Sequence, residues 1–144
     1  MDRGRNGSKH HLLVDGGGLP LAWTLTGGNR NDITQLIELV DGVPSVAGRV
    51  GRPRKRPDRV TADRGYDFDK YRRLLRKRGI SPEIARRETA HGSGLGRTRW
   101  VVERTFAWMT RWRRLVRDYE KRVDVSKAMI HVALGSLLLR RIVH

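Results

Sequence analysis

Two acidic residues of this 144-residue chain could take part in metal-ion or acid–base chemistry. The first, Asp63, ends a predicted strand over residues 59–63 and is followed directly by Arg64 and Gly65. A carboxylate at the carboxyl end of a strand lies where open α/β sheets bind ligands and metals. Asp is also common in turns and helix caps, so this residue taken alone fits a structural role equally well.

The second acidic residue, Glu103, lies 40 positions after Asp63 on a helix predicted over residues 98–121. Helical periodicity places it on the same side as Arg99 and Arg114, opposite an apolar and aromatic stripe. Glu103 therefore fits a metal ligand on a basic face or an i, i+4 ion-pair partner of Arg99. The stripe has the period of a buried helix face, which favours core packing over base stacking. It comprises Val101, Thr105, Trp108, Trp112, Leu115 and Tyr119.

The elements before Asp63 begin with a predicted β-hairpin, residues 9–15 and 19–26, whose turn is supplied by the run of glycines after Asp15. Asp32 and Gln35 have the spacing of a capping box and predict the start of a short apolar helix.

The elements after Asp63 complete an α/β pattern. We expect Asp69 to cap a helix that ends at Gly79, and an edge strand over 80–85 that contains Pro82. The last predicted element is an apolar helix over 125–143. The sheet is expected to be mixed because it begins with a hairpin, and residues 1–144 are expected to form a single domain.

The charge of the chain indicates a polyanionic partner. Lys and Arg number 31 against 15 acidic residues, which gives a formal net charge of +16 and a pI near 11.5. Such an excess favours binding to nucleic acid. A basic protein without a nucleic-acid role, or one associated with the ribosome, is the alternative.

Several other classes of protein are disfavoured. The chain has no cysteine, which excludes disulfides and thiolate metal sites. The first residues have no apolar signal region, and the longest apolar stretch, 128–139, is too short for a membrane span. We therefore expect no membrane association and a cytoplasmic location.

A basic loop over residues 44–58 has two interpretations. Its segment Gly51-Arg52-Pro53-Arg54 resembles the core of an AT-hook, which enters the minor groove of DNA. The simpler interpretation, which the short segment favours, is a solvated loop whose Arg52, Arg54 and Lys55 contact phosphates at most.

Several separated motifs resemble those of the DDE-type transposases of bacterial insertion sequences, in the group of insertion sequences five and four. They are Gly7-Ser8-Lys9-His10-His11-Leu12, Leu25-Thr26-Gly27-Gly28-Asn29, Thr61-Ala62-Asp63-Arg64-Gly65-Tyr66-Asp67 and Arg99-Trp100-Val101-Val102-Glu103-Arg104. The resemblance extends over nearly the whole chain and preserves the order of the motifs.

This resemblance implies a ribonuclease-H-like fold in which three carboxylates hold two Mg²⁺ or Mn²⁺ ions for phosphoryl transfer. Asp63 matches the second carboxylate, Glu103 matches the third, and Arg99 matches a basic residue expected to contact phosphate. Gly96 stands where the family has Tyr. Thr110 stands where it has a basic residue, with Arg111 adjacent and Arg114 on the same helix.

The resemblance also implies that the first catalytic Asp, and the central strand that carries it, lie outside this sequence. Asp15 falls in the hairpin turn and Asp2 in a polar leader, so neither replaces it. The missing strand would leave two neighbouring strands with unpaired edges. The chain thus resembles either the second-frame product of a frameshifted transposase or a decayed copy.

The expected function is DNA binding and metal-dependent strand cleavage and transfer at the ends of an insertion sequence. The expected partners are transposon-end and target DNA, further copies of the chain on DNA, and an upstream-frame partner or fusion; bound to DNA, the protein would lie at the nucleoid. The alternatives are a non-enzymatic DNA-binding remnant or regulator of transposition and, with less support, an RNA-binding protein.

Overall fold

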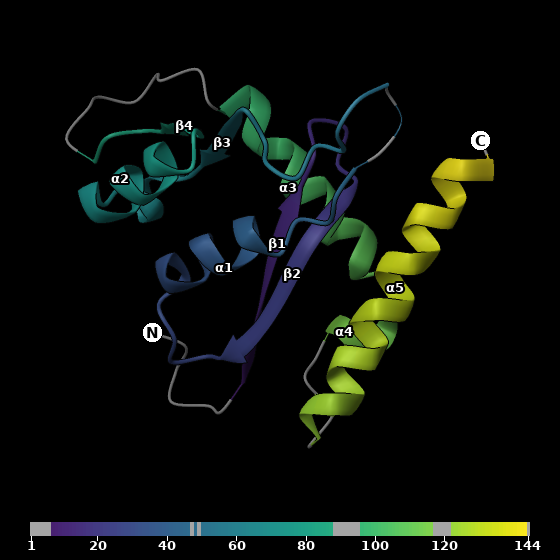
Figure 1. Ribbon diagram of the computed structural model, residues 1–144. Coiled ribbons are helices and arrows are strands. Elements are labelled where there is room, and N and C mark those ends of the chain that lie inside the picture. The colour runs from purple at the N-terminus through teal and green to yellow at the C-terminus, as the bar shows by residue number, and fades with distance from the viewer. Residues whose placement is uncertain (1–6, 47, 49, 88–95, 117–121, 144) are drawn as a thin grey trace.

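The computed structural model of this chain describes residues 7–46, 48, 50–87, 96–116 and 122–143, with side chains in the third helix from Trp100 onward. The described strands form two small sheets, and helices pack around them. The hairpin and α3 (Gly96–Met109) lie in the middle of the structure. Helices α1 and α2 lie on one side of them, and α4 and α5 on the other (Figure 1). The expected α/β class is confirmed.

The β-hairpin is confirmed: β1 (Ser8–Val14) pairs antiparallel with β2 (Pro20–Gly27). Its turn is closed by the carboxylate of Asp15, which accepts hydrogen bonds from the amides of Gly17 and Leu19, each at 2.8 Å. Gly18 completes the turn with φ of +86°, a conformation that glycine adopts without a steric penalty.

The segment after the hairpin forms a 3₁₀ turn, η1 (Asp32–Gln35), followed by α1 (Leu36–Asp41). The prediction that Asp32 caps it is wrong. The side chain of Asn31 is the cap, since its Oδ1 accepts from the amide of Ile33, while Asp32 pairs with Lys9 at 3.1 Å. The carboxylate of Asp32 is thus paired with Lys9 of β1, although the capping-box pattern predicted that it would cap the helix.

The second sheet consists of β3 (Arg59–Ala62) and β4 (Ser81–Ile84), which are parallel and connected through α2 (Asp69–Lys77). Gly79, with φ of +74°, follows the end of α2 as expected. Asp69 is the first residue of α2 rather than its cap, and it pairs with Arg86 at 2.7 Å.

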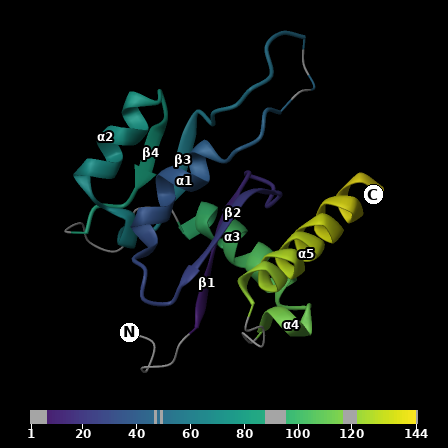
Figure 2. The ribbon, with the colours of Figure 1, turned by 60° about the horizontal axis from the view of Figure 1, so that its bottom comes forward.

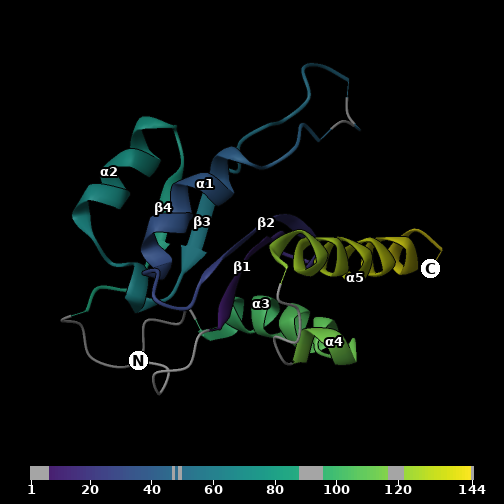
Figure 3. The ribbon, with the colours of Figure 1, turned by 90° about the horizontal axis from the view of Figure 1, so that it is seen from below.

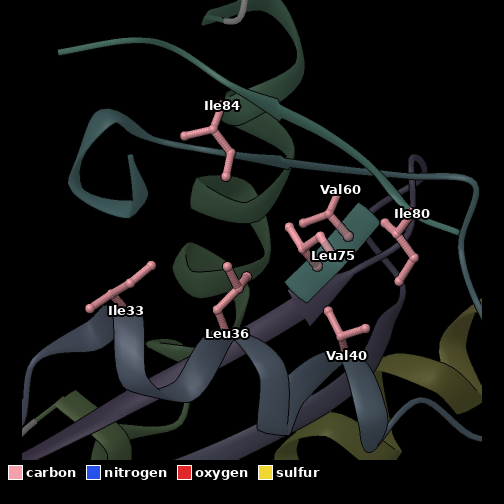
Figure 4. Close-up of a cluster of buried hydrophobic side chains, with 7 residues drawn as sticks. All are labelled: Ile33, Leu36, Val40, Val60, Leu75, Ile80 and Ile84. Carbon is pink, nitrogen blue, oxygen red and sulfur yellow. The ribbon is translucent and has the colours of Figure 1, made fainter. Parts of the chain in front are cut away.

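The main core joins α1, α2 and the second sheet. Figure 4 shows the buried side chains of α1 facing those of β3, α2 and β4; the cluster comprises Ile33, Leu36, Val40, Val60, Leu75, Ile80 and Ile84. Leu13 of β1 packs against the same cluster. Beside it lies a buried ion pair: Arg72 contacts Asp67 at 2.6 Å and also donates to the carbonyl of Ile84 at 2.7 Å. This pair connects α2 to the turn after β3 and to β4.

The predicted helix over 98–121 is interrupted. It ends at Met109 and resumes as α4 (Arg113–Val116). Thr110 donates its hydroxyl hydrogen to the carbonyl of Ala107, and the amides of Arg111 and Trp112 bond three residues back instead of four. The tighter turn redirects the chain, so that Leu115 packs against the buried residues of the last helix. Residues 117–121 of the predicted helix lie outside the described range.

The last helix, α5 (Val123–Val143), confirms the predicted apolar helix. Ile130 and Leu134 pack with Met109 of α3 in a second cluster, against Leu12, Trp23 and Leu25 of the hairpin. Within the described residues, no helix combines the length and apolar character that a membrane crossing requires.

The described strands form two two-stranded sheets, where the sequence analysis expected one mixed sheet. Both strand orientations of a mixed sheet are present, antiparallel in the hairpin and parallel in β3–β4. The two sheets share the main core through Leu13 and Val60, and α3 contacts both β1 and β3. They are therefore joined through side chains and helices.

We predict a pH dependence of stability from His11. This side chain is 5% exposed in β1, and its Nε2 lies 2.8 Å from the hydroxyl of Thr26. Burial lowers the pKa of His11 below its ordinary value of 6.5. Because the unfolded chain then binds the proton at higher pH, the free energy of unfolding should fall as pH drops below about 6.5 and through the folded pKa. Urea unfolding at a series of pH values should show this fall. It should shrink in His11→Gln and persist in the exposed control His131→Gln.

Candidate active site

Asp63 lies directly after β3, as predicted, and is exposed. Its carboxylate Oδ1 accepts the amide of Gly65 at 2.8 Å and so caps the short 3₁₀ turn η2 (Arg64–Tyr66). The structure thus realises the structural role that the sequence allowed for this residue. The metal-binding role stays a prediction.

The surroundings of Asp63 are built from η2 and the chain after β4. The guanidinium of Arg87 donates to the carbonyls of Arg64 and Gly65 at 3.3 and 3.2 Å. Burial raises the pKa of the Tyr66 hydroxyl to about 12, and the carboxylates of Asp32 and Asp63 add to the shift. Asp63 therefore lies in a polar surface region that also contains the carboxylate of Asp32 and the guanidinium of Arg87.

Glu103 lies on α3 and is exposed. It faces away from the helix side that packs on the hairpin turn, where Val101 and Thr105 are buried. Because α3 contacts β3, the elements that carry Asp63 and Glu103 are neighbours. The side chain of Arg99 lies outside the described set, so its ion pair with Glu103 and its phosphate contact stay predictions.

The position of α3 is fixed by the hairpin turn. The hydroxyl of Thr105, fully buried, donates to the carbonyl of Gly18 at 2.9 Å, and Arg104 donates to the carbonyl of Gly17 at 2.8 Å. A Cβ on Gly18 would lie 3.0 Å from Arg104, 3.1 Å from Thr105 and 3.4 Å from Val101. The side chains of α3 therefore pack so closely on the turn that a Cβ at Gly18 would press against them.

The described residues hold no group of three or more His, Cys, Asp or Glu side chains able to bind a metal ion. The carboxylate of Asp15 accepts hydrogen bonds within its own turn. Asp2 lies outside the described range. The described residues thus do not by themselves form the three-carboxylate centre that the resemblance implies.

The predicted phosphate-binding residues fall in two regions. Arg52, Arg54 and Lys55 are exposed in the loop 44–58, which extends away from the helices (Figures 2 and 3). Arg54 pairs with Asp58, and its backbone forms a β-bridge with Val46.

Arg111 and Arg114 form the second region. Both are exposed, Arg111 in the turn after α3 and Arg114 on α4. Arg111 lines a pocket together with Trp108, Trp112, Arg140 and Arg141. Both tryptophans belong to the stripe that was predicted to pack in the core, but each is only partly buried. It missed the two arginines of α5, because no spacing connects residues 111 and 140 along the chain.

These elements define a class of protein: a small, strongly basic α/β domain with separate acidic residues on a strand end and on a helix. Comparison with known proteins shows that residues 2–138 match the family model of the transposase DDE domain. The chain belongs to this family.

A relative of this chain is named as a transposase of an insertion sequence. The chain is 55% identical over 138 residues to the putative transposase for insertion sequence element IS402 of Burkholderia cepacia. The aligned part covers 96% of this chain and 64% of the relative, so the chain spans less than two thirds of that protein's length. No solved structure matches this chain. The resemblance to a DDE-type transposase of an insertion sequence is thus confirmed.

We predict that Gly18→Ala destabilises the domain by about 1–3 kcal/mol. The substitution places a side chain at φ of +86° and pushes against Arg104 and Thr105. Gly16→Ala in the same turn is the matched control, because its Cβ would meet nothing within 4 Å. Chemical denaturation measures both. Equal stabilities of the two variants would contradict the close approach of α3 to the turn.

Proposed function

We propose that this domain binds the ends of its insertion sequence and contributes two of the three carboxylates for DNA strand cleavage and joining. The observation that carries the proposal is the placement of Asp63 and Glu103. Both are exposed acidic side chains in a chain of net charge +16; Asp63 directly follows β3, Glu103 lies on α3, and β3 and α3 contact each other. Transposases of the DDE family generally use divalent metal ions, and carboxylate oxygens are suitable ligands for Mg²⁺ or Mn²⁺.

The third carboxylate would come from a strand outside the described residues. Each strand of the present structure has one strand partner, so β1 and β3 each keep an edge that no described strand pairs. Leu13 and Val60 share one core, and α3 contacts both strands. We propose that an apolar strand ending in Asp pairs between β1 and β3 and completes a ribonuclease-H-like sheet. The segment encoded directly upstream is the proposed source, as a fusion or as a separate chain.

Two basic regions would hold the DNA backbone. Arg52, Arg54 and Lys55 extend on the loop, and Arg111 and Arg114 lie beyond the end of α3, with Arg99 on the helix itself. Their guanidinium and ammonium groups suit phosphate oxygens. Assembly of several copies on DNA would bring two transposon ends together, at the nucleoid of the cell.

A second function is favoured by one observation, the lack of a three-carboxylate cluster among the described residues. A chain that never acquires the third ligand would bind DNA through its charge alone, as a remnant or a regulator that occupies transposon ends. Such binding would weaken with salt and would be indifferent to chelators.

We predict that Asp63→Asn abolishes DNA nicking. The test uses the protein extended by its upstream segment, with DNA that carries the insertion-sequence ends and with Mg²⁺ or Mn²⁺. Loss of one metal ligand should lower the nicking rate at least about a hundredfold. Asp124→Asn, at the exposed start of α5, is the control and should retain the rate.

The outcome separates the two functions. Nicking that persists in Asp63→Asn would exclude this residue from the catalytic centre. DNA binding without any metal-dependent nicking in the extended protein would favour the regulator.

A further inference from the structure

A pocket of about 280 Å³ lies between the hairpin turn, the end of α3 and the last turns of α5. Gly18 and Leu19 contribute from the turn, and Trp108 and Trp112 from α3 and its end. The pocket belongs to neither acidic residue of the candidate active site. The candidate active site therefore does not explain this pocket.

The lining of the pocket is cationic and aromatic. Arg111, Arg140 and Arg141 are on its wall, and none of its lining residues is acidic. Three guanidinium groups suit an anion with several oxygens, and the two indole rings suit a flat, apolar surface. A ligand that combines both is a nucleotide.

Part of the lining is held in place before any ligand arrives. Arg141 donates to the carbonyl of Gly17 at 3.2 Å and lies 5.3 Å from the centre of the Trp108 ring. Arg104 lies 4.9 Å from the same ring and donates to the same carbonyl. The turn thus orients Arg141 of the lining, and Arg104 next to it, against Trp108.

The size of the pocket limits its occupant. Small-molecule sites begin at about 300 Å³, so this one suits a single small group and is too narrow for a duplex. A base inside a duplex is stacked on its neighbours and cannot reach an indole ring. An unpaired nucleotide can, because its base is free to stack on an aromatic side chain.

We propose that this pocket binds one unpaired nucleotide of a DNA strand, with its base against Trp112 and its phosphate at Arg111 and Arg140. The proposal rests on the proposed function only in taking DNA as the polyanion. It adds a site for a distorted or frayed position of the DNA, apart from Asp63 and Glu103.

The test compares two DNA probes in fluorescence anisotropy titrations with this chain. One is a fully paired duplex, and the other is the same duplex with one unpaired nucleotide in its centre. The wild-type chain should bind the second probe on the order of tenfold more tightly, as expected for one stacked base. Trp112→Ala should remove this preference and leave the affinity for the paired duplex unchanged. Arg140→Ala should weaken binding to the unpaired probe more than to the paired one.

Arg113→Ala is the matched charge control, since Arg113 is exposed on α4 and does not line the pocket. It should lower both affinities equally. Should Trp112→Ala prove unfolded by circular dichroism, Trp112→Phe serves instead and should reduce the preference in part.

Three results would count against the proposal. The pocket proposal is wrong if the wild-type chain binds both probes equally, or if the Trp112 variant still prefers the probe with the unpaired nucleotide. In either case, salt-dependent binding of the paired duplex would still support the proposed function. A folded chain that binds neither probe overturns the pocket and the DNA-binding part of the proposed function together.

Discussion

The contact between the hairpin turn and α3 is the constraint on which the rest of this structure depends. Thr105, fully buried, reaches the carbonyl of Gly18 across 87 positions of sequence, and a side chain in place of Gly18 would press against Thr105 and Arg104. The contact sets where α3 lies relative to β1. It thereby sets where Glu103 is presented and where the pocket at Trp108 and Trp112 opens. The stabilising energy of one such buried hydrogen bond is about 1 kcal/mol, but leaving the carbonyl unpaired would cost about 1–3 kcal/mol.

The second constraint is the division of the strands into two sheets. The hairpin packs on α5 through Trp23 and Leu25, while β3 and β4 pack on α1 and α2. Between them, β1 and β3 share the main core through Leu13 and Val60, and both contact α3. An arrangement with unpaired strand edges invites a further strand. The proposed additional strand would place its own carboxylate between Asp63 and Glu103. The three carboxylates would then form one metal centre.

Local patterns predicted the elements well where glycine or strict periodicity determines the backbone. The hairpin turn at Gly18, the end of α2 at Gly79 and the strand before Asp63 all follow from residues next to one another. Long-range contacts decided the rest. Lys9 takes Asp32 away from the helix cap, and the packing of Leu115 on α5 interrupts the helix that periodicity extended to residue 121. The buried pair of Arg72 and Asp67 was invisible because the sequence pattern does not show which charged residue of a helix is covered.

The same distinction applies to the site. The positions of Asp63 and Glu103 on a strand end and a helix were predicted from the sequence, and the structure confirms those positions. The pocket was not predicted, since its walls come from three segments around residues 18, 111 and 140 that only the fold brings together. The aromatic stripe was assigned to the core on its period alone. Period identifies the face of a helix, but it does not show whether the neighbouring elements cover that face completely.

Hydrogen exchange at the backbone amides of β1 and β3 tests the central claim, that a strand from outside the described residues completes the sheet. The measurement compares this chain with the protein extended by its upstream segment. We predict that the amides of β1 and β3 that point away from β2 and β4 exchange rapidly in this chain and become protected together in the extended protein, while amides of β2 change little. Equal exchange of β1 and β3 in the two proteins would contradict it, since a new strand between them must take up their free hydrogen-bonding groups.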